Sequence, residues 1–125
     1  MSLWIKNELD KIGNADELQI ASLRHDGTMR NPVTIWVVRV GDELYVRSVN
    51  GRSAAWFRGT QASHEGHILA GGVDKDVTFI EVSDPDTIDQ IDNAYLTKYK
   101  RYPAQYVNPM LEPKAKEATI KLVPR

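Results

Sequence analysis

A cluster of basic and small polar residues surrounds one break in the sequence VRSVNGRSAAWFRG. The alternating pattern before the break is typical of a strand, and the pair Asn50-Gly51 allows the positive φ of a tight turn. A helix is expected to follow, with Ser53 as its N-cap. Helix N-termini attract anions, and arginine binds phosphate through paired hydrogen bonds. The pattern therefore predicts an anion site at which Arg47 and Arg52 flank the start of the helix.

Trp56 adds a flat apolar side chain one turn into that helix, and such a side chain is suited to a ring system. Side chains alternate along a strand, so Arg47 is expected on the same face as Tyr45. A second interpretation requires no ligand. In that interpretation Trp56 belongs to the core and the arginines pair with surface acids. These residues alone leave both interpretations open.

Other chemical motifs are weaker. His64 and His67 flank Glu65, but in an extended segment a three-residue spacing places the two imidazoles on opposite faces, which disfavours a metal site. His25 lies in a turn-forming stretch and is expected to be exposed. The sequence contains no nucleophile elbow, P-loop or dinucleotide fingerprint. We therefore predict no catalytic side chain and no metal ligand.

Composition limits the class of protein. The 125 residues are 42% hydrophobic, which is sufficient for one core. A net charge of −1 provides no global positive field, so neither nucleic acid nor a membrane surface is an expected partner. The absence of cysteine favours a reducing cytoplasm. The longest strongly apolar run, residues 35–38, is too short to cross a bilayer. We expect a soluble cytoplasmic protein.

The hydrophobic pattern predicts one mainly β (α+β) domain over residues 1–125, beginning with a short helix at 3–12. Strands are predicted at 17–23, 33–40, 44–49, in GHILAGG, in DVTFIEV and around 118–122, with a helix at 53–61. The turns between the first three strands are too short for parallel crossovers. We therefore expect a six-stranded antiparallel split barrel, formed by about 17–82 plus 115–123, with flanking helices.

A helical segment is predicted over about residues 84–113. Its main helix begins with Asp84 as N-cap and Pro85 at the first helical position. Four tyrosines follow at Tyr95, Tyr99, Tyr102 and Tyr106. Packing of a helix face is the simpler explanation for them, and a substrate-binding wall is the alternative.

Both faces of the 33–40 strand are apolar, since the pair Ile35 and Val37 alternates with the pair Trp36 and Val38. One face can fill the barrel. The other needs either a covering helix or a partner subunit, because an exposed apolar row would form an interface patch.

The order of these segments resembles that of the flavin- and deazaflavin-binding split β-barrel proteins, the pyridoxamine-phosphate-oxidase-like superfamily. Two stretches carry the likeness. GTMRNPVTIWVV is similar to the basic, glycine-containing turn and following strand of these proteins, and VRSVNGRSAAWFRG is similar to their polar loop and aromatic helix. The nearest likeness is to the deazaflavin-dependent nitroreductase-like proteins and an allied bacterial family of unknown function.

The resemblance implies a bound FMN or 8-hydroxy-5-deazaflavin coenzyme, with its phosphate near the 47–53 loop and its ring against the 32–36 strand. It also implies a homodimer and an oxidoreductase that passes two electrons to a small molecule. The implied cofactor-binding residues are Pro32, Thr34, Trp36, Arg47, Ser48, Asn50, Gly51, Arg52, Ser53 and Trp56.

One departure from the pattern supports an alternative function. Ala54-Ala55 stands where the relatives often have a Lys-His-Pro-like sequence, so one phosphate-binding cation is missing. The alternative is a cofactor-free split barrel that acts as a small-anion-binding or oligomerising module.

Overall fold

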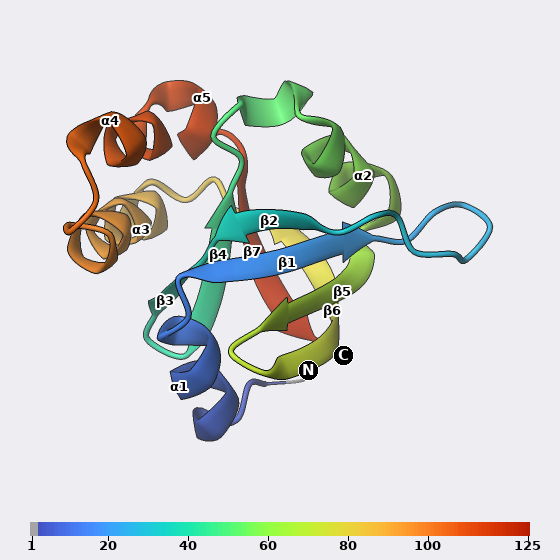
Figure 1. Cartoon of the computed structure of the whole chain (residues 1–125). Coiled ribbons are helices and arrows are strands. Elements are labelled where there is room, and N and C mark those ends of the chain that lie inside the picture. The colour runs from blue at the N-terminus through green and yellow to red at the C-terminus, as the bar shows by residue number, and fades with distance from the viewer. Residues whose placement is uncertain (1–2) are drawn as a thin grey trace.

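An antiparallel sheet of seven strands forms a nearly closed barrel in the computed structural model, which describes residues 3–125 (Figure 1). The strand order is β2-β1-β5-β6-β7-β4-β3, and every pairing is antiparallel. The predicted antiparallel split barrel is confirmed. The strands are β1 (Glu17–Ser22), β2 (Val33–Trp36), β3 (Val38–Val40), β4 (Glu43–Arg47), β5 (Glu65–Ala70), β6 (Val73–Glu81) and β7 (Thr119–Pro124).

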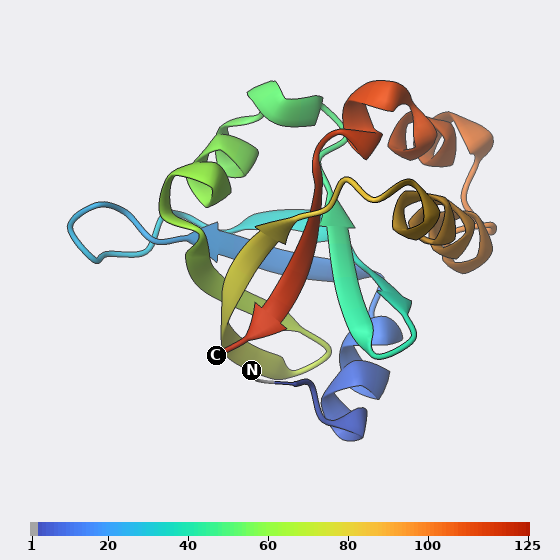
Figure 2. The same cartoon turned by 180° about the vertical axis from the view of Figure 1, so that it is seen from behind.

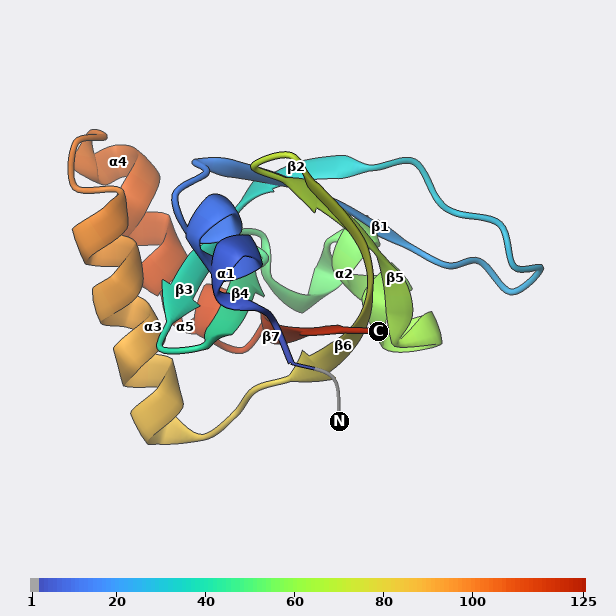
Figure 3. The ribbon, with the colours of Figure 1, turned by 90° about the horizontal axis from the view of Figure 1, so that it is seen from below.

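Helices cover both ends and one flank of the barrel. Helix α1 lies across one end, as the view from below shows (Figure 3), and α2 lies at the other. Helices α3, α4 and α5 gather on the flank beside β3 and β4, while β7 runs between β6 and β4 (Figure 2). The helices are α1 (Lys6–Gly13), 3-10 helix η1 (Gly51–Ser53), α2 (Ala55–Ser63), α3 (Pro85–Lys98), α4 (Ala104–Val107), 3-10 helix η2 (Asn108–Leu111) and α5 (Pro113–Lys116).

The prediction of six strands is wrong by one, because the predicted 33–40 strand is divided at Val37. Its first half pairs with β1 and its second half with β4. Two side chains of the α3 region bind the backbone at the break. The hydroxyl of Tyr99 accepts the Val37 N–H at 3.1 Å, and the Lys98 ammonium donates to the Val37 carbonyl at 2.6 Å. These contacts satisfy backbone groups that leave the sheet ladder.

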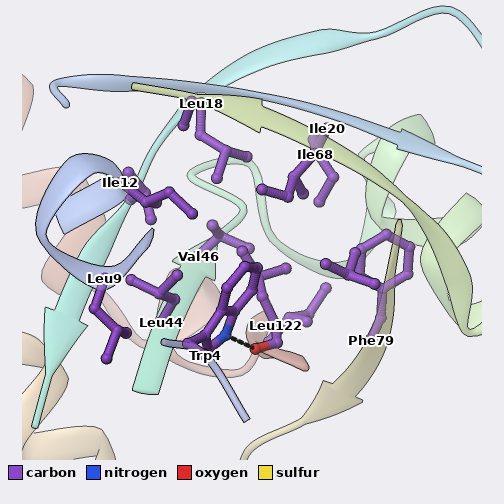
Figure 4. Close-up of a cluster of buried hydrophobic side chains, with 14 of the residues drawn as sticks. Trp4, Leu9, Ile12, Leu18, Ile20, Leu44, Val46, Ile68, Phe79 and Leu122 are labelled. Atoms are coloured by element: carbon purple, nitrogen blue, oxygen red, sulfur yellow. Dashed lines mark hydrogen bonds between the residues drawn. The ribbon is translucent and has the colours of Figure 1, made fainter. Parts of the chain in front are cut away.

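The interior of the barrel is apolar and includes Trp4 (Figure 4). The Trp4 indole enters it and donates a hydrogen bond to the Leu122 carbonyl at 2.9 Å. Leu44 and Val46 point into the same core. Tyr45 belongs to a separate cluster outside the barrel, so the predicted alternation along this strand is confirmed.

Helix α3 covers the outer face of β3 and β4. It begins as predicted, because the Asp84 carboxylate accepts the Thr87 N–H at 3.0 Å and Pro85 occupies the first turn. Its buried face packs on the strands in a cluster made of Val38, Tyr45, Ile91, Tyr95, Tyr99, Val107 and Met110. The second apolar face of the 33–40 segment is therefore covered by the chain's own helix.

The start of α2 differs from the prediction. Residues 51–53 form a 3-10 turn, and the N-cap of α2 is Ala54, which has no side chain able to accept a hydrogen bond. The Ser53 hydroxyl instead lies 3.4 Å from the Asn50 carbonyl. Ser53 is therefore not the cap, and the first N–H groups of α2 have no side-chain partner at that position.

Within residues 3–125 we find no helix with the length and apolar character needed to cross a membrane.

Candidate functional site

A cleft of about 320 Å³ lies between β2, the end of β4, the start of α2 and the α4–η2 segment. Only one of its lining side chains carries a formal charge. The lining residues are Thr34, Ile35, Trp36, Arg47, Val49, Trp56, Gln105, Tyr106, Pro109 and Met110. The cleft brings together four of the predicted site residues, namely Thr34, Trp36, Arg47 and Trp56.

Three aromatic side chains form the walls of this cleft. Trp36 is half-buried, and one of its ring faces stacks on Tyr99 with centroids 3.9 Å apart and an interplanar angle of 4°. Trp56, also half-buried, is held edge-on to Phe57. Tyr106 is 57% exposed. Because Trp36 and Trp56 are packed against neighbouring rings, the cleft presents flat surfaces suited to a planar ligand.

Arg47 lies in the cleft wall, but its side chain has no exposed surface. Its Nε donates to the Thr119 hydroxyl at 2.9 Å, and its Nη1 donates to Asp92 Oδ1 at 2.5 Å. Nη1 also reaches the Met110 carbonyl at 3.0 Å, and Nη2 reaches the Ile88 carbonyl at 3.2 Å. The guanidinium therefore joins β4, β7, α3 and η2. All of these partners are internal, because α3 and η2 pack over this face of β4.

A second cation shares the Arg47 partner. Lys116 Nζ lies 3.1 Å from Asp92 Oδ2, so the two oxygens of one half-buried carboxylate bind two cations. The guanidinium of Arg47 also lies over the Tyr95 ring, 5.5 Å from its centroid. This cluster links the helical flank to the barrel directly behind the cleft.

Arg52 is not part of the cleft lining. Its Nη1 donates to Glu81 Oε1 and to the Glu117 carbonyl, both at 2.8 Å. It lines a separate surface hollow of about 610 Å³, together with the acids Glu81, Asp89 and Glu117. The structure thus separates the two arginines that were predicted to hold one anion.

The remaining predicted site residues do not line the cleft. Ser48 is buried, and its hydroxyl has no hydrogen-bond partner. Gly51 is buried against Lys114, while Asn50 is exposed. Pro32 is exposed and borders another depression on the outer face of β1 and β5.

Sequence reasoning missed the α4–η2 side of the cleft. Helix packing is the simpler explanation of the four tyrosines in the sequence, but the structure gives them different surroundings. Tyr95 and Tyr99 are buried in packing, whereas Tyr106 faces the cleft. No periodicity in this proline-interrupted segment distinguishes Pro109 or Met110 as lining residues.

The buried tyrosines behind the cleft are poor proton carriers. Burial raises the pKa of Tyr95 and of Tyr99, so both hydroxyls stay protonated across the physiological range. The Tyr95 hydroxyl has no partner, and the Tyr99 hydroxyl donates to the Asp16 carbonyl at 2.6 Å. Neither group is placed to act as a general base.

The histidines lie away from the cleft. His64 ends α2 in the left-handed conformation at φ 58°, and His25 is exposed in the β1–β2 loop, as expected. On β5, burial alone would lower the pKa of His67, but hydrogen bonds to Asp76 and Asp74 outweigh it and raise that pKa. Within residues 3–125, no group of three or more acidic, histidine or cysteine side chains has a metal-binding arrangement.

Residues 8–122 match the model of a protein family described as an uncharacterized protein conserved in bacteria (DUF2255). The chain belongs to this family. The match covers most of the chain and agrees with the predicted likeness to a bacterial family of unknown function. No curated protein matches the sequence.

Solved structures share the fold at low sequence identity. A candidate pyridoxamine 5'-phosphate oxidase from Listeria innocua matches with a TM-score of 0.66 and 14% identity, over 94% of this chain and 90% of that one. A FAD-binding protein from Mesorhizobium loti matches with a TM-score of 0.59 and 17% identity, over 98% and 91%. An F420 reductase matches with a TM-score of 0.55 and 17% identity, over 98% and 94%.

The same fold also occurs in HutZ, the heme storage protein from Vibrio cholerae. The TM-score is 0.64 at 14% identity, over 100% of this chain and 92% of that one. These likenesses show that the chain shares the fold of these proteins, as the predicted resemblance implied.

Proposed function

We propose that the protein binds the planar ring of a flavin or deazaflavin in the cleft and acts as an oxidoreductase on a small molecule. The observation that carries this proposal is the aromatic cleft between Trp36, Trp56 and Tyr106 on a split-barrel fold. Structures with this fold include an F420 reductase and a FAD-binding protein, which supports the choice of ring.

The residues of the cleft fit the ring of such a cofactor. A volume of about 320 Å³ lies at the lower end of the roughly 300–1,000 Å³ typical of small-molecule sites. Trp56 and the exposed part of Trp36 supply flat contact surface, and Met110 supplies an adaptable apolar one. Strand β2 is an end strand of the sheet, so its backbone groups on the side away from β1 are free to bind ring carbonyl and imino groups.

When bound, such a ring supplies two-electron transfer, and the protein supplies position and electrostatics. The cleft lining contains no histidine or carboxylate, and its one cation, Arg47, is bound to Asp92. The side chains of this chain would therefore hold the ring flat and exclude water from it. No proton transfer is assigned to any of them.

A second copy of the chain would complete the site. Tyr106 and Val49 line the cleft and remain exposed, as does Val33 on the neighbouring strand. A homodimer that covers these side chains would bury apolar surface and enclose the ligand between two subunits. Sedimentation at micromolar concentration is expected to show a dimer. A monomer, with and without flavin, would contradict this part of the proposal.

A cofactor-free barrel is the second candidate function. The observation that favours it is that neither Arg47 nor Arg52 is free to hold a phosphate. A barrel of this kind would act through a small anion or through self-association alone.

Equilibrium titration separates the two candidates. Riboflavin, FMN and an 8-hydroxy-5-deazaflavin are each added to purified protein, and binding is followed by the visible difference spectrum and by calorimetry. Trp56→Ala is expected to weaken ring binding by about five- to 150-fold, since stacking on an aromatic side chain is worth about 1–3 kcal/mol. Trp56→Phe is the matched control and should retain most of the affinity. Parent protein that binds none of the three compounds would favour the cofactor-free barrel.

A further inference from the structure

We infer that the cleft recognises its ligand through the uncharged ring and discriminates little between phosphorylated and unphosphorylated forms. The inference rests on the proposed function and specifies its ligand class. The ligand would then be any member of the flavin or deazaflavin class with the right ring, including a riboside that carries no phosphate.

The first support is the charge of the lining. Nine of the ten lining residues are uncharged at neutral pH, and the tenth is Arg47. The Arg47 side chain has no exposed surface, and each of its three nitrogens already donates to a protein acceptor. Four of its five N–H groups already have acceptors, and the covered guanidinium leaves a phosphate no surface to contact.

The second support is the position of Arg52. Its guanidinium bridges Glu81 on β6 and the Glu117 carbonyl before β7, and it lines a hollow outside the cleft. That hollow is also lined by Asp89 and Lys116, and the carboxylate of Glu81 already pairs with Arg52. A ligand seated on Trp36 and Trp56 would therefore gain little from this arginine.

One feature beside the cleft, the N-terminus of α2, can still attract an anion. Its N-cap is Ala54, so the first N–H groups have no side-chain acceptor there, and Trp56 follows in the first turn. A helix N-terminus alone changes the affinity for an anion by about two- to fivefold. A phosphate held by two free arginines would instead be worth a factor of about a hundred or more.

The test compares matched pairs of ligands that differ in one phosphate. Dissociation constants are measured by calorimetry for riboflavin against FMN, at low and at moderate ionic strength. The structure predicts a ratio below about tenfold that changes little with salt, because no free cation of the cleft contributes a screened attraction. An FMN preference of tenfold or more, whatever its source, would overturn the inference.

Variants make the result specific to the arginines. Arg52→Met should leave both dissociation constants within about twofold of the parent, and Arg58→Met, an exposed cation on α2, serves as the matched control. A selective loss of FMN affinity in Arg52→Met would also overturn the inference. If riboflavin, FMN and the 8-hydroxy-5-deazaflavin all fail to bind, the proposed function fails and the inference fails with it. If both bind but FMN binds far more tightly, the inference fails alone.

Discussion

Replacing Arg47 with methionine tests whether this residue holds the structure together or contacts a ligand. Methionine keeps much of the side-chain length and removes the charge and every donor. In the parent, the Met110 and Ile88 carbonyls accept hydrogen bonds from Arg47 nitrogens at 3.0 and 3.2 Å, and the substitution removes both donors. It also removes one of the two cations on Asp92.

The expected loss is large for one side chain. Breaking a buried ion pair by removing one partner costs about 3–5 kcal/mol. Lys116 still neutralises part of the Asp92 charge, so the loss of stability expected for Arg47→Met lies toward the lower end of that range. Against a typical total stability of about 5–15 kcal/mol, this is a substantial fraction.

Urea unfolding, followed by tryptophan fluorescence, measures the free energy of unfolding for each variant. Arg58→Met makes the same substitution at an exposed site and should change that free energy by about 0.5 kcal/mol or less. Arg47→Lys keeps a positive charge but lacks the planar fork, so it should fall between Arg47→Met and the parent. It also keeps the test informative if Arg47→Met does not fold. An Arg47→Met protein that is as stable as the parent but binds flavin tenfold more weakly would refute the internal role.

Two further predictions concern sites away from the cleft. Gly66→Ala should lower the free energy of unfolding in urea by about 1–3 kcal/mol or more, because a Cβ at this position would lie 2.1 Å from the Ala21 carbonyl oxygen. An unfolding free energy equal to that of the parent would show that β1 and β5 pack less closely. Burial opposes the charged form of His67, but its hydrogen bonds to Asp76 and Asp74 raise its pKa in the folded protein. The stability that the His67 imidazolium contributes is therefore present below the unfolded pKa of about 6.5. That stability is lost as pH rises through the pKa of His67 in the folded protein. His67→Gln should remove that fall in the urea midpoint, and an unchanged pH profile in this variant would contradict the assignment.

Local signals in the sequence were sufficient to place most elements. The start of α3 needed only Asp84 and Pro85, whose effects act within one turn, and the structure confirms both. The alternation of Leu44, Tyr45 and Val46 correctly separated the barrel core from the outer cluster, since it depends only on strand geometry.

Contacts between distant segments account for what the sequence could not predict. The break at Val37 depends on Lys98 and Tyr99, about 60 residues further along the chain, and no pattern within residues 33–40 marks it. Arg47 was placed on the correct face of its strand, but its burial follows from helices that arrive later and cover that face.

The cap of α2 was misplaced for a related reason. Ser53 is a favourable N-cap residue, yet residues 51–53 form a 3-10 turn and the helix begins at Ala55, two residues later than predicted. The cleft itself required the α4–η2 segment, whose position relative to β2 is a property of the folded chain.

The indole N–H resonances of the three tryptophans test the central claim most directly. Trp36 and Trp56 line the cleft, whereas the Trp4 indole is buried in the barrel and bound to the Leu122 carbonyl, which makes it an internal control. In a ¹⁵N–¹H correlation spectrum, saturating riboflavin is predicted to shift the Trp36 and Trp56 signals strongly and the Trp4 signal little. Bound riboflavin that leaves the Trp36 and Trp56 signals in place would contradict the assignment of the cleft as the ring site.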